Sequence, residues 1–283
     1  MNEKLVLLDG ATGTRLWELA SEQGLKKASV WSYNLTCPEI VVRVGEEYAA
    51  AGSKILCANT FSANGMSVSR ESDYTVDAVV RSGVELARAA AVKAGARVAV
   101  DVGPLTALLQ PYGSLSAAEA AELFRAQISA GVSAGAELIF LETFMDLEML
   151  KLAAAEARRF DVPLLCSMSF AKRRRTMMGN TVAQIVAELE PFAPDGIGIN
   201  CSSGPVEAAE VLREYAQTTD RPLLFKPNAG APVTAPDGTE SAPYTAQTFA
   251  AEAKAVLPLV TYAGACCGSD ASYIKALGAL IGA

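Results

Sequence analysis

Short apolar runs alternate with longer amphipathic stretches along the whole chain. The runs are rich in Val, Leu and Ile and predict strands, whereas the stretches between them predict helices. The predicted strands lie at about residues 5–9, 54–60, 97–101, 138–143, 163–169, 196–201, 222–226 and 260–265. Continuous apolar strands separated by helices are typical of parallel sheets that are covered on both faces. Eight such units predict an α/β fold, a (β/α)8 barrel that forms a single domain over residues 1–283. A doubly wound open sheet is the alternative.

Three stretches between the predicted elements are interpreted as irregular. They are residues 24–44, in which Pro38 begins a helix, the polar loop that follows Thr60, and a Pro/Gly-rich loop from Pro227 to about Tyr244. None of them divides the chain into two domains. Barrel enzymes place their chemistry in the loops that follow the strands. We therefore expect a functional site at the carboxyl ends of the predicted strands.

Composition excludes several classes of function. A net charge of −7 and a pI of about 4.9 disfavour nucleic-acid binding, and the basic run Lys172–Arg175 is interpreted as a solvated loop. No signal peptide or membrane span is expected, since Met1–Lys4 leads directly into a short apolar run. Six cysteines in a chain of this length do not suggest a disulfide framework, so we expect a reducing cytoplasm. The chain has no histidine, so metal binding falls to thiols, carboxylates, amines or backbone groups.

Three cysteines follow predicted strands near the C-terminal half of the chain. Cys266 and Cys267 are adjacent and precede a glycine, and Cys201 ends an earlier apolar run. Three thiols without a fourth in either motif suggest a zinc site that keeps one position open for chemistry. The alternative is that these cysteines are small buried hydrophobic residues.

Other polar residues also end the predicted strands. In a barrel, the carboxyl ends of all strands meet at one mouth, so these side chains are expected to converge. They are Asp9, Asn59, Thr60, Asp101, Glu142, Thr143, Asn200, Lys226 and Asn228. Any one of them could instead cap a turn or satisfy the backbone of a loop. The glycine-rich loop Gly10–Thr14 lacks the complete dinucleotide and P-loop patterns, so its glycines are expected to let the backbone approach a small ligand.

At this point the chain resembles the homocysteine S-methyltransferases, and among them the homocysteine-binding barrel of cobalamin-dependent methionine synthases. The resemblance spans nearly the whole chain, and the two cysteine motifs are its most specific part. The matching segments are Asp9–Thr14, Asn59–Phe61, Gly103–Pro104, Glu142–Phe144, Ile199–Ser202, Pro227–Gly230 and Gly264–Gly268. This chain has Ala265 where the family usually has a second glycine before the paired cysteines, which adds a methyl group beside the expected metal.

The resemblance implies a zinc-dependent methyltransferase that makes methionine from homocysteine. It implies that Cys201, Cys266 and Cys267 bind zinc and are catalytic, because zinc would keep the substrate sulfur as a reactive thiolate. It further implies that homocysteine binds through its amino group, held by acidic residues. On this basis Asp9 and Glu142 are expected to hold that amino group, with Thr60 nearby; Asn200 and Asn228, at the strand ends, complete the expected substrate-binding residues.

The methyl donor is less well determined by the sequence. We expect a methylcorrinoid carried on a separate protein, mainly because the chain resembles the cobalamin-dependent barrel, and also because it has no histidine to ligate a corrinoid itself. The alternative donors are S-methylmethionine, S-adenosylmethionine and betaine. Two other classes of protein stay open: a lyase that forms a Schiff base through Lys226, and a non-catalytic zinc-bearing subunit. No nucleic acid or membrane partner is expected.

Overall fold

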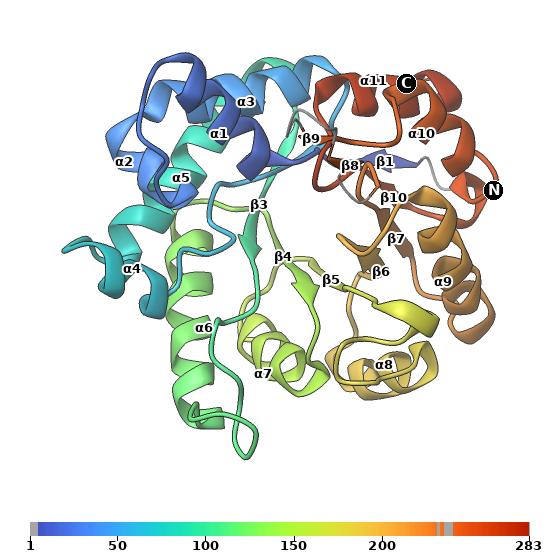
Figure 1. The fold of residues 1–283 in the computed structure, drawn as a ribbon. Coiled ribbons are helices and arrows are strands. Elements are labelled where there is room, and N and C mark those ends of the chain that lie inside the picture. Colours follow the sequence, from blue (N-terminus) through green and yellow to red (C-terminus); the bar gives the residue numbers. More distant parts are fainter. Residues whose placement is uncertain (1–4, 231–232, 235–239, 283) are drawn as a thin grey trace.

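The computed structural model describes residues 5–230, 233–234 and 240–282. Eight parallel strands form one sheet in the order β1-β10-β7-β6-β5-β4-β3-β2. Each strand lies beside the next one along the chain, as in a barrel, which confirms the predicted (β/α)8 fold (Figure 1). The strands are β1 Val6–Leu7, β2 Ile55–Cys57, β3 Arg97–Val102, β4 Leu138–Phe144, β5 Leu164–Met168, β6 Gly196–Asn200, β7 Leu223–Lys226 and β10 Tyr262–Ala263.

The seam between β1 and β2 is bridged by single hydrogen bonds instead of a strand ladder. The backbone N–H of Lys54 donates to the carbonyl of Leu7 at 2.7 Å. Three residues further along the chain, the N–H of Cys57 donates to the Oδ2 atom of Asp9 at 2.6 Å. A side-chain carboxylate therefore replaces a backbone acceptor where the first two strands separate, and Asp9 is part of the closure of the barrel.

An outer ring of eight helices covers the strands. Neighbouring helices in this ring contact one another in chain order, and the last, α11, contacts α3 to complete the circle (Figure 1). The ring is made of α3 Pro38–Ala50, α5 Val76–Ala91, α6 Ala117–Ser133, α7 Leu147–Ala157, α8 Val182–Leu189, α9 Pro205–Thr218, α10 Ala246–Ala253 and α11 Ala271–Ile281. A further helix, α1 Thr12–Glu22, packs on α3.

Polar side chains cap the N-termini of most of these helices. Ser116 and Thr181 form complete capping boxes with Glu119 and Gln184, respectively. Each box satisfies backbone N–H groups that have no partner inside the helix.

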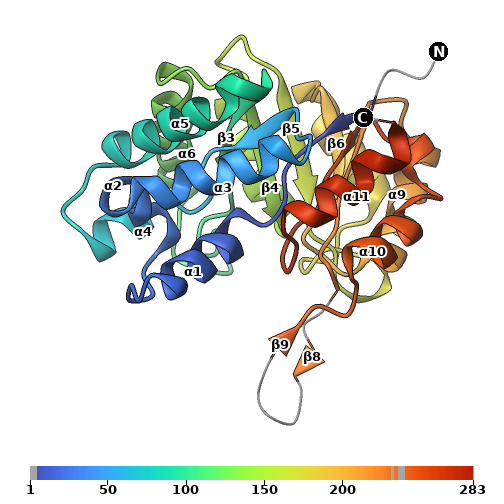
Figure 2. The ribbon, with the colours of Figure 1, turned by 90° about the horizontal axis from the view of Figure 1, so that it is seen from above.

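Two short helices and a hairpin lie in stretches predicted as irregular. They are α2 Tyr33–Thr36, α4 Gly65–Glu71, and the antiparallel pair β8 Val233–Thr234 and β9 Glu240–Ser241. The hairpin projects away from the barrel (Figure 2), and residues 231–232 and 235–239 of the predicted loop lie outside the described residues. The sequence of α4 favours a helix only weakly, but Asn64 caps it by accepting from the N–H of Ser67 at 3.1 Å.

Single 3-10 turns complete the described secondary structure. They are η1 Val30–Ser32, η2 Val92–Ala94, η3 Lys172–Arg174, η4 Glu190–Phe192 and η5 Leu257–Leu259. Among the described residues, no helix combines the length and the apolar character needed to cross a membrane.

Two apolar layers hold the fold together. The larger lies between the strands and the ring of helices, and the smaller fills the barrel interior. The interior layer includes fully or almost fully buried side chains from six strands or their immediate ends, namely Leu8, Ile55, Ala99, Phe140, Leu165 and Leu224. Because side chains alternate along a strand, the residues two positions further on also face inward. Those positions determine the chemistry of the mouth.

Candidate active site

A polar layer caps the apolar interior of the barrel at the carboxyl ends of the strands. Asp101 follows Ala99 by two positions, Glu142 follows Phe140, and Lys226 follows Leu224. All three charged residues are buried, with exposed fractions of 6%, 6% and 2%. Charged residues are buried only where partners or ligands compensate them. This polar layer is therefore a candidate binding site.

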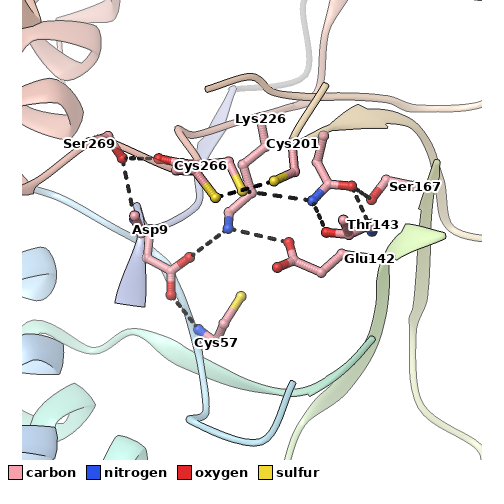
Figure 3. A network of polar contacts seen from close by, with 12 residues as sticks. Asp9, Cys57, Glu142, Thr143, Ser167, Cys201, Lys226, Cys266 and Ser269 are labelled. Carbon is pink, nitrogen blue, oxygen red and sulfur yellow. Dashed lines mark hydrogen bonds and ion pairs between the residues drawn. The ribbon is translucent and has the colours of Figure 1, made fainter. Parts of the chain in front are cut away.

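The three predicted thiols meet at this layer (Figure 3). Cys201 follows β6, whereas Cys266 and Cys267 follow β10, and their sulfur atoms all lie within 4.8 Å of one another. The Sγ atoms of Cys201 and Cys267 are 3.3 Å apart. Three sulfur ligands at such separations suit zinc or another thiophilic ion, and Cys267 is exposed while Cys266 is buried. The geometry therefore fits the predicted metal and leaves one side of the cluster accessible.

Local backbone geometry turns these sulfurs toward one another. Cys201 has a φ of 44°, in the left-handed region, and its N–H donates to the carbonyl of Lys226 at 3.2 Å. A residue other than glycine in this region stores strain of about 1–3 kcal/mol, which is common at functional sites. Gly268, with a φ of 80°, makes the corresponding turn after Cys267. Ala265 is fully buried in the outer core and does not line the cavity described below.

Asn200 connects the thiols to the neighbouring strands. Its Oδ1 atom accepts from the N–H of Thr143 at 2.8 Å and from the hydroxyl of Ser167 at 2.7 Å. Its amide nitrogen donates to the Oγ1 atom of Thr143 at 2.7 Å and lies 3.9 Å from the Sγ atom of Cys266. Figure 3 shows these contacts around Thr143. They hold the backbone of Thr143, which has a φ of 65°. Asn200 therefore fixes the relative positions of β4, β5, β6 and the thiol loops.

Beside the thiols, a buried lysine lies between two carboxylates (Figure 3). The Nζ atom of Lys226 lies 3.5 Å from Asp9 Oδ1 and 3.3 Å from Glu142 Oε2. Burial alone would lower the pKa of Lys226, but Glu142 and Asp9 outweigh burial and raise the pKa well above its usual value. Lys226 is therefore a cation in the folded protein.

The carboxyl groups themselves are shifted toward their neutral forms. Burial raises the pKa of Glu142 to about 7, although Lys226 opposes the shift. Burial, together with the charge of Glu142, raises the pKa of Asp101 well above its usual value. The Oδ1 atom of Asp101 is inaccessible to solvent and has no hydrogen-bond partner in the described part of the chain. A carboxyl group in this state is suited to receive a cation from a ligand.

A cavity of about 410 Å³ joins the thiols to the acids. Four of the predicted site residues line it: Glu142, Cys201, Cys266 and Cys267. The backbone loop Gly10–Thr14 forms part of the wall, as expected for a loop that approaches a small ligand. The sequence interpretation did not include Asp101, Lys226, Cys57 or Phe61 among the binding residues, although all four line the cavity. The inward alternation along β3 and β7 is the signal that identifies the first two.

The other predicted substrate residues lie outside the wall of this cavity. Asp9 is 1% exposed and faces Lys226 and Cys57. Thr60 is fully buried, and its hydroxyl donates to the carbonyl of Asp101 at 2.8 Å and accepts from its N–H at 3.0 Å. The Oδ1 atom of Asn228 is buried without a partner in the described part of the chain. Their substrate contacts, like that of Asn200, stay predictions.

A larger hollow of about 630 Å³ lies beside the basic run. Arg173 and Arg174 line it together with Glu207 and Glu210. Arg174 lies 3.7 Å from Glu210 and 3.6 Å from Glu214, and its side chain is 57% exposed. Exposed pairs of this kind contribute little to stability. The run is thus partly neutralised by α9, and its interpretation as a solvated loop agrees with the exposure of Arg174.

The mouth of the barrel thus places three thiols, which could hold a metal ion, beside buried acids. The chain matches the family described as homocysteine S-methyltransferase over residues 6–281. It therefore belongs to the homocysteine S-methyltransferase family, a family of methyltransferases, as the motifs indicated.

Known proteins of this family resemble the chain over nearly all its length. The methionine synthases of Mycobacterium tuberculosis and Mycobacterium leprae are both 26% identical to it over 99% of this chain. The chain spans only about a quarter of their lengths, 25% and 24%. Crystal structures of the homocysteine methyltransferase MmuM from Escherichia coli share the fold. The oxidised form has a TM-score of 0.80 at 23% identity, and the metallated form 0.76 at 21%; each alignment covers 98% of this chain and 96% of the other.

Proposed function

We propose that this chain is a zinc-dependent homocysteine S-methyltransferase that produces methionine. The observation that carries the proposal is the gathering of three cysteine sulfurs, within 4.8 Å of one another, on the wall of a cavity that also contains buried acids. Family membership supports homocysteine as the substrate. The existence of a metallated form of MmuM, a protein of the same fold, supports the metal.

Cys201, Cys266 and Cys267 would hold the zinc ion. Three sulfur ligands leave one position of a four-coordinate zinc for a ligand from outside the protein. When bound, zinc supplies a Lewis acid that favours the deprotonated, nucleophilic form of a thiol. This role needs no histidine base, and the chain has none. The cysteines must stay reduced for this purpose, so a reducing cytoplasm remains the predicted setting.

The remaining residues of the mouth bind and orient the substrate. Glu142 presents a carboxylate to the cavity and would attract the ammonium group of homocysteine, while Lys226 and Asp9 hold Glu142 in place. Positioning of this kind removes much of the entropic barrier to a reaction between two molecules. In the reaction, a bond forms between the substrate sulfur and the methyl carbon. The bond from that carbon to the donor breaks, and the donor keeps the electron pair.

For the donor, we favour a methylcorrinoid bound to a separate protein. The support is that methionine synthases match 99% of this chain, together with the resemblance to their cobalamin-dependent homocysteine-binding barrel. The exposed side chain of Arg174 could contribute to docking. S-methylmethionine, S-adenosylmethionine and betaine are the competing donors.

A panel of donors tests this function. The purified zinc-loaded protein is incubated with homocysteine and each donor in turn, and the methionine formed is measured. Methionine formed from a methylated corrinoid protein supports the whole proposal. Turnover with a sulfonium donor or betaine alone would reject the corrinoid and keep the methyltransferase. No turnover with any donor, despite bound zinc, would favour the non-catalytic zinc-bearing subunit.

The Schiff-base alternative has less physical support. A lysine attacks a carbonyl only as the neutral amine, and lyases obtain that form by lowering the pKa of the lysine. Here the ion pairs of Lys226 with Asp9 and Glu142 raise its pKa. Treatment with borohydride and a carbonyl substrate should therefore leave Lys226 unmodified.

A further inference from the structure

The three acids of the mouth differ in how far their oxygens are already occupied. Asp9 Oδ2 accepts a hydrogen bond from the N–H of Cys57, and Oδ1, which has no hydrogen-bond partner in the described part of the chain, forms an ion pair with Lys226 at 3.5 Å. It is 1% exposed and lies outside the wall of the 410 Å³ cavity. Glu142 lines the cavity and uses Oε2 for Lys226. A ligand in the cavity therefore meets Glu142 before it meets Asp9.

Asp101 is the acid without a partner. It lines the same cavity and is 6% exposed, and its Oδ1 atom has no hydrogen-bond partner in the described part of the chain. Leaving a buried polar group unpaired is costly, and more so for a charged group. Lys226 is the only cationic side chain that lines this cavity, and it is engaged by the other two acids. Burial raises the pKa of Asp101, and an ammonium group from a ligand in this cavity would supply the missing partner and favour the charged carboxylate.

The backbone of Asp101 is fixed as a binding residue requires. Thr60 bonds both its N–H, at 3.0 Å, and its carbonyl, at 2.8 Å. The side chain of Gln127, from α6, bonds the carbonyl of Thr60 at 2.6 Å. These contacts lock the ends of β2 and β3 together. The backbone that carries the side chain of Asp101 is therefore held in place before any ligand arrives.

We propose that Asp101 binds the ammonium group of the amino-acid substrate, alongside Glu142. This inference rests on homocysteine as the proposed substrate and names the group that recognises its amine. It predicts that the site selects thiols that carry an ammonium group. A thiol of the same length without that group would leave the buried carboxyl of Asp101 unpaired.

Binding of two ligands to the zinc-loaded protein tests this role. The ligands are L-homocysteine and its desamino analogue 4-sulfanylbutanoate, which keeps the thiol and the carboxylate. Asp101→Asn preserves the shape of the side chain and removes its charge. We expect this variant to bind homocysteine about 10- to 100-fold more weakly, as for a lost charged hydrogen bond, and to bind the analogue no more weakly than the wild type does.

The controls separate this role from a structural one. Asp73→Asn changes an exposed aspartate and should leave both affinities and the zinc content unchanged. Equal weakening of both ligands by Asp101→Asn, or no weakening of either, would overturn the inference. If Asp101→Asn does not fold, Asp101→Ala is measured with the same expectations. A wild-type protein that does not bind homocysteine would reject the proposed function itself, whereas strong homocysteine binding by both Asp101 variants would reject this inference alone.

Discussion

The two sides of the cavity are built on different principles. The thiol side comes from the loops after β6 and β10, and its sulfur atoms contact mainly one another. Its members are Cys201, Cys266 and Cys267. The acid side comes from strands or their immediate ends and includes a cation, the side chain of Lys226. Its members are Asp9, Asp101, Glu142 and Lys226. The thiol side brings together three like groups that a bound metal ion could join, whereas on the acid side Lys226 forms ion pairs with two of the three carboxyl groups. One side is built to hold a metal and the other to recognise a charged group.

Removing one thiol should have the largest effect and tests the role of the thiol side. Cys201→Ala should abolish zinc binding and turnover, because two sulfurs cannot hold a catalytic zinc in place of three. The fold should survive, since the barrel core does not depend on this residue. Zinc content is measured by atomic absorption and folding by circular dichroism. Cys37→Ser is the matched control, and full zinc occupancy in Cys201→Ala would disprove the assignment.

Removing the internal cation should weaken the protein itself. Lys226→Met leaves Asp9 and Glu142 buried without their cation, and breaking such a pair costs about 3–5 kcal/mol in the free energy of unfolding. Chemical denaturation of the zinc-loaded protein measures the loss. Lys254→Met changes an exposed lysine and should have little effect. Equal stability of the two variants would show that the acid side does not need its lysine.

Glu142→Gln should affect the substrate and not the metal. We expect homocysteine affinity to fall about 10- to 100-fold, because a charged partner of the ammonium is lost, while zinc content stays at the wild-type level. Isothermal titration calorimetry gives the affinity. Glu148→Gln, an exposed position on α7, serves as the control. Unchanged affinity in Glu142→Gln would remove this residue from the binding site.

The smallest expected effect is a pH dependence of binding. The pKa of Glu142 is raised to about 7 by burial, so its carboxyl becomes protonated as the pH falls through that value. The neutral form no longer attracts an ammonium group, and affinity for homocysteine should decrease toward acidic pH by at most about tenfold per pH unit. Titrations with zinc content checked at each pH measure this slope. A slope that persists unchanged in Glu142→Gln would assign the effect to another group.

The thiol side could be predicted directly from the sequence. Two adjacent cysteines before a glycine, and a third at the end of another apolar run, needed only the barrel to bring them together. The strands were also predicted near their observed places, because apolar periodicity reflects local physics. By contrast, α4 was missed because its sequence favours a helix weakly and depends on a cap and on packing against α6.

The acid side could be predicted only in part. The alternation along β3 and β7 places Asp101 and Lys226 inside the barrel, and this signal is present in the sequence. The pairing of Lys226 with both Asp9 and Glu142 depends on how the barrel closes and on the register between strands far apart in the chain. No local pattern contains that information. The unpaired state of Asp101 follows from this pairing and is visible only in the folded protein.

X-ray absorption at the zinc edge tests the central claim most directly. The measurement compares the zinc-loaded protein with and without homocysteine and counts the sulfur neighbours of the metal. If three cysteines hold zinc and the substrate sulfur takes the open position, the count should rise from three to four. A count that does not change when homocysteine is bound would contradict the account, because the substrate sulfur would then lie away from the metal.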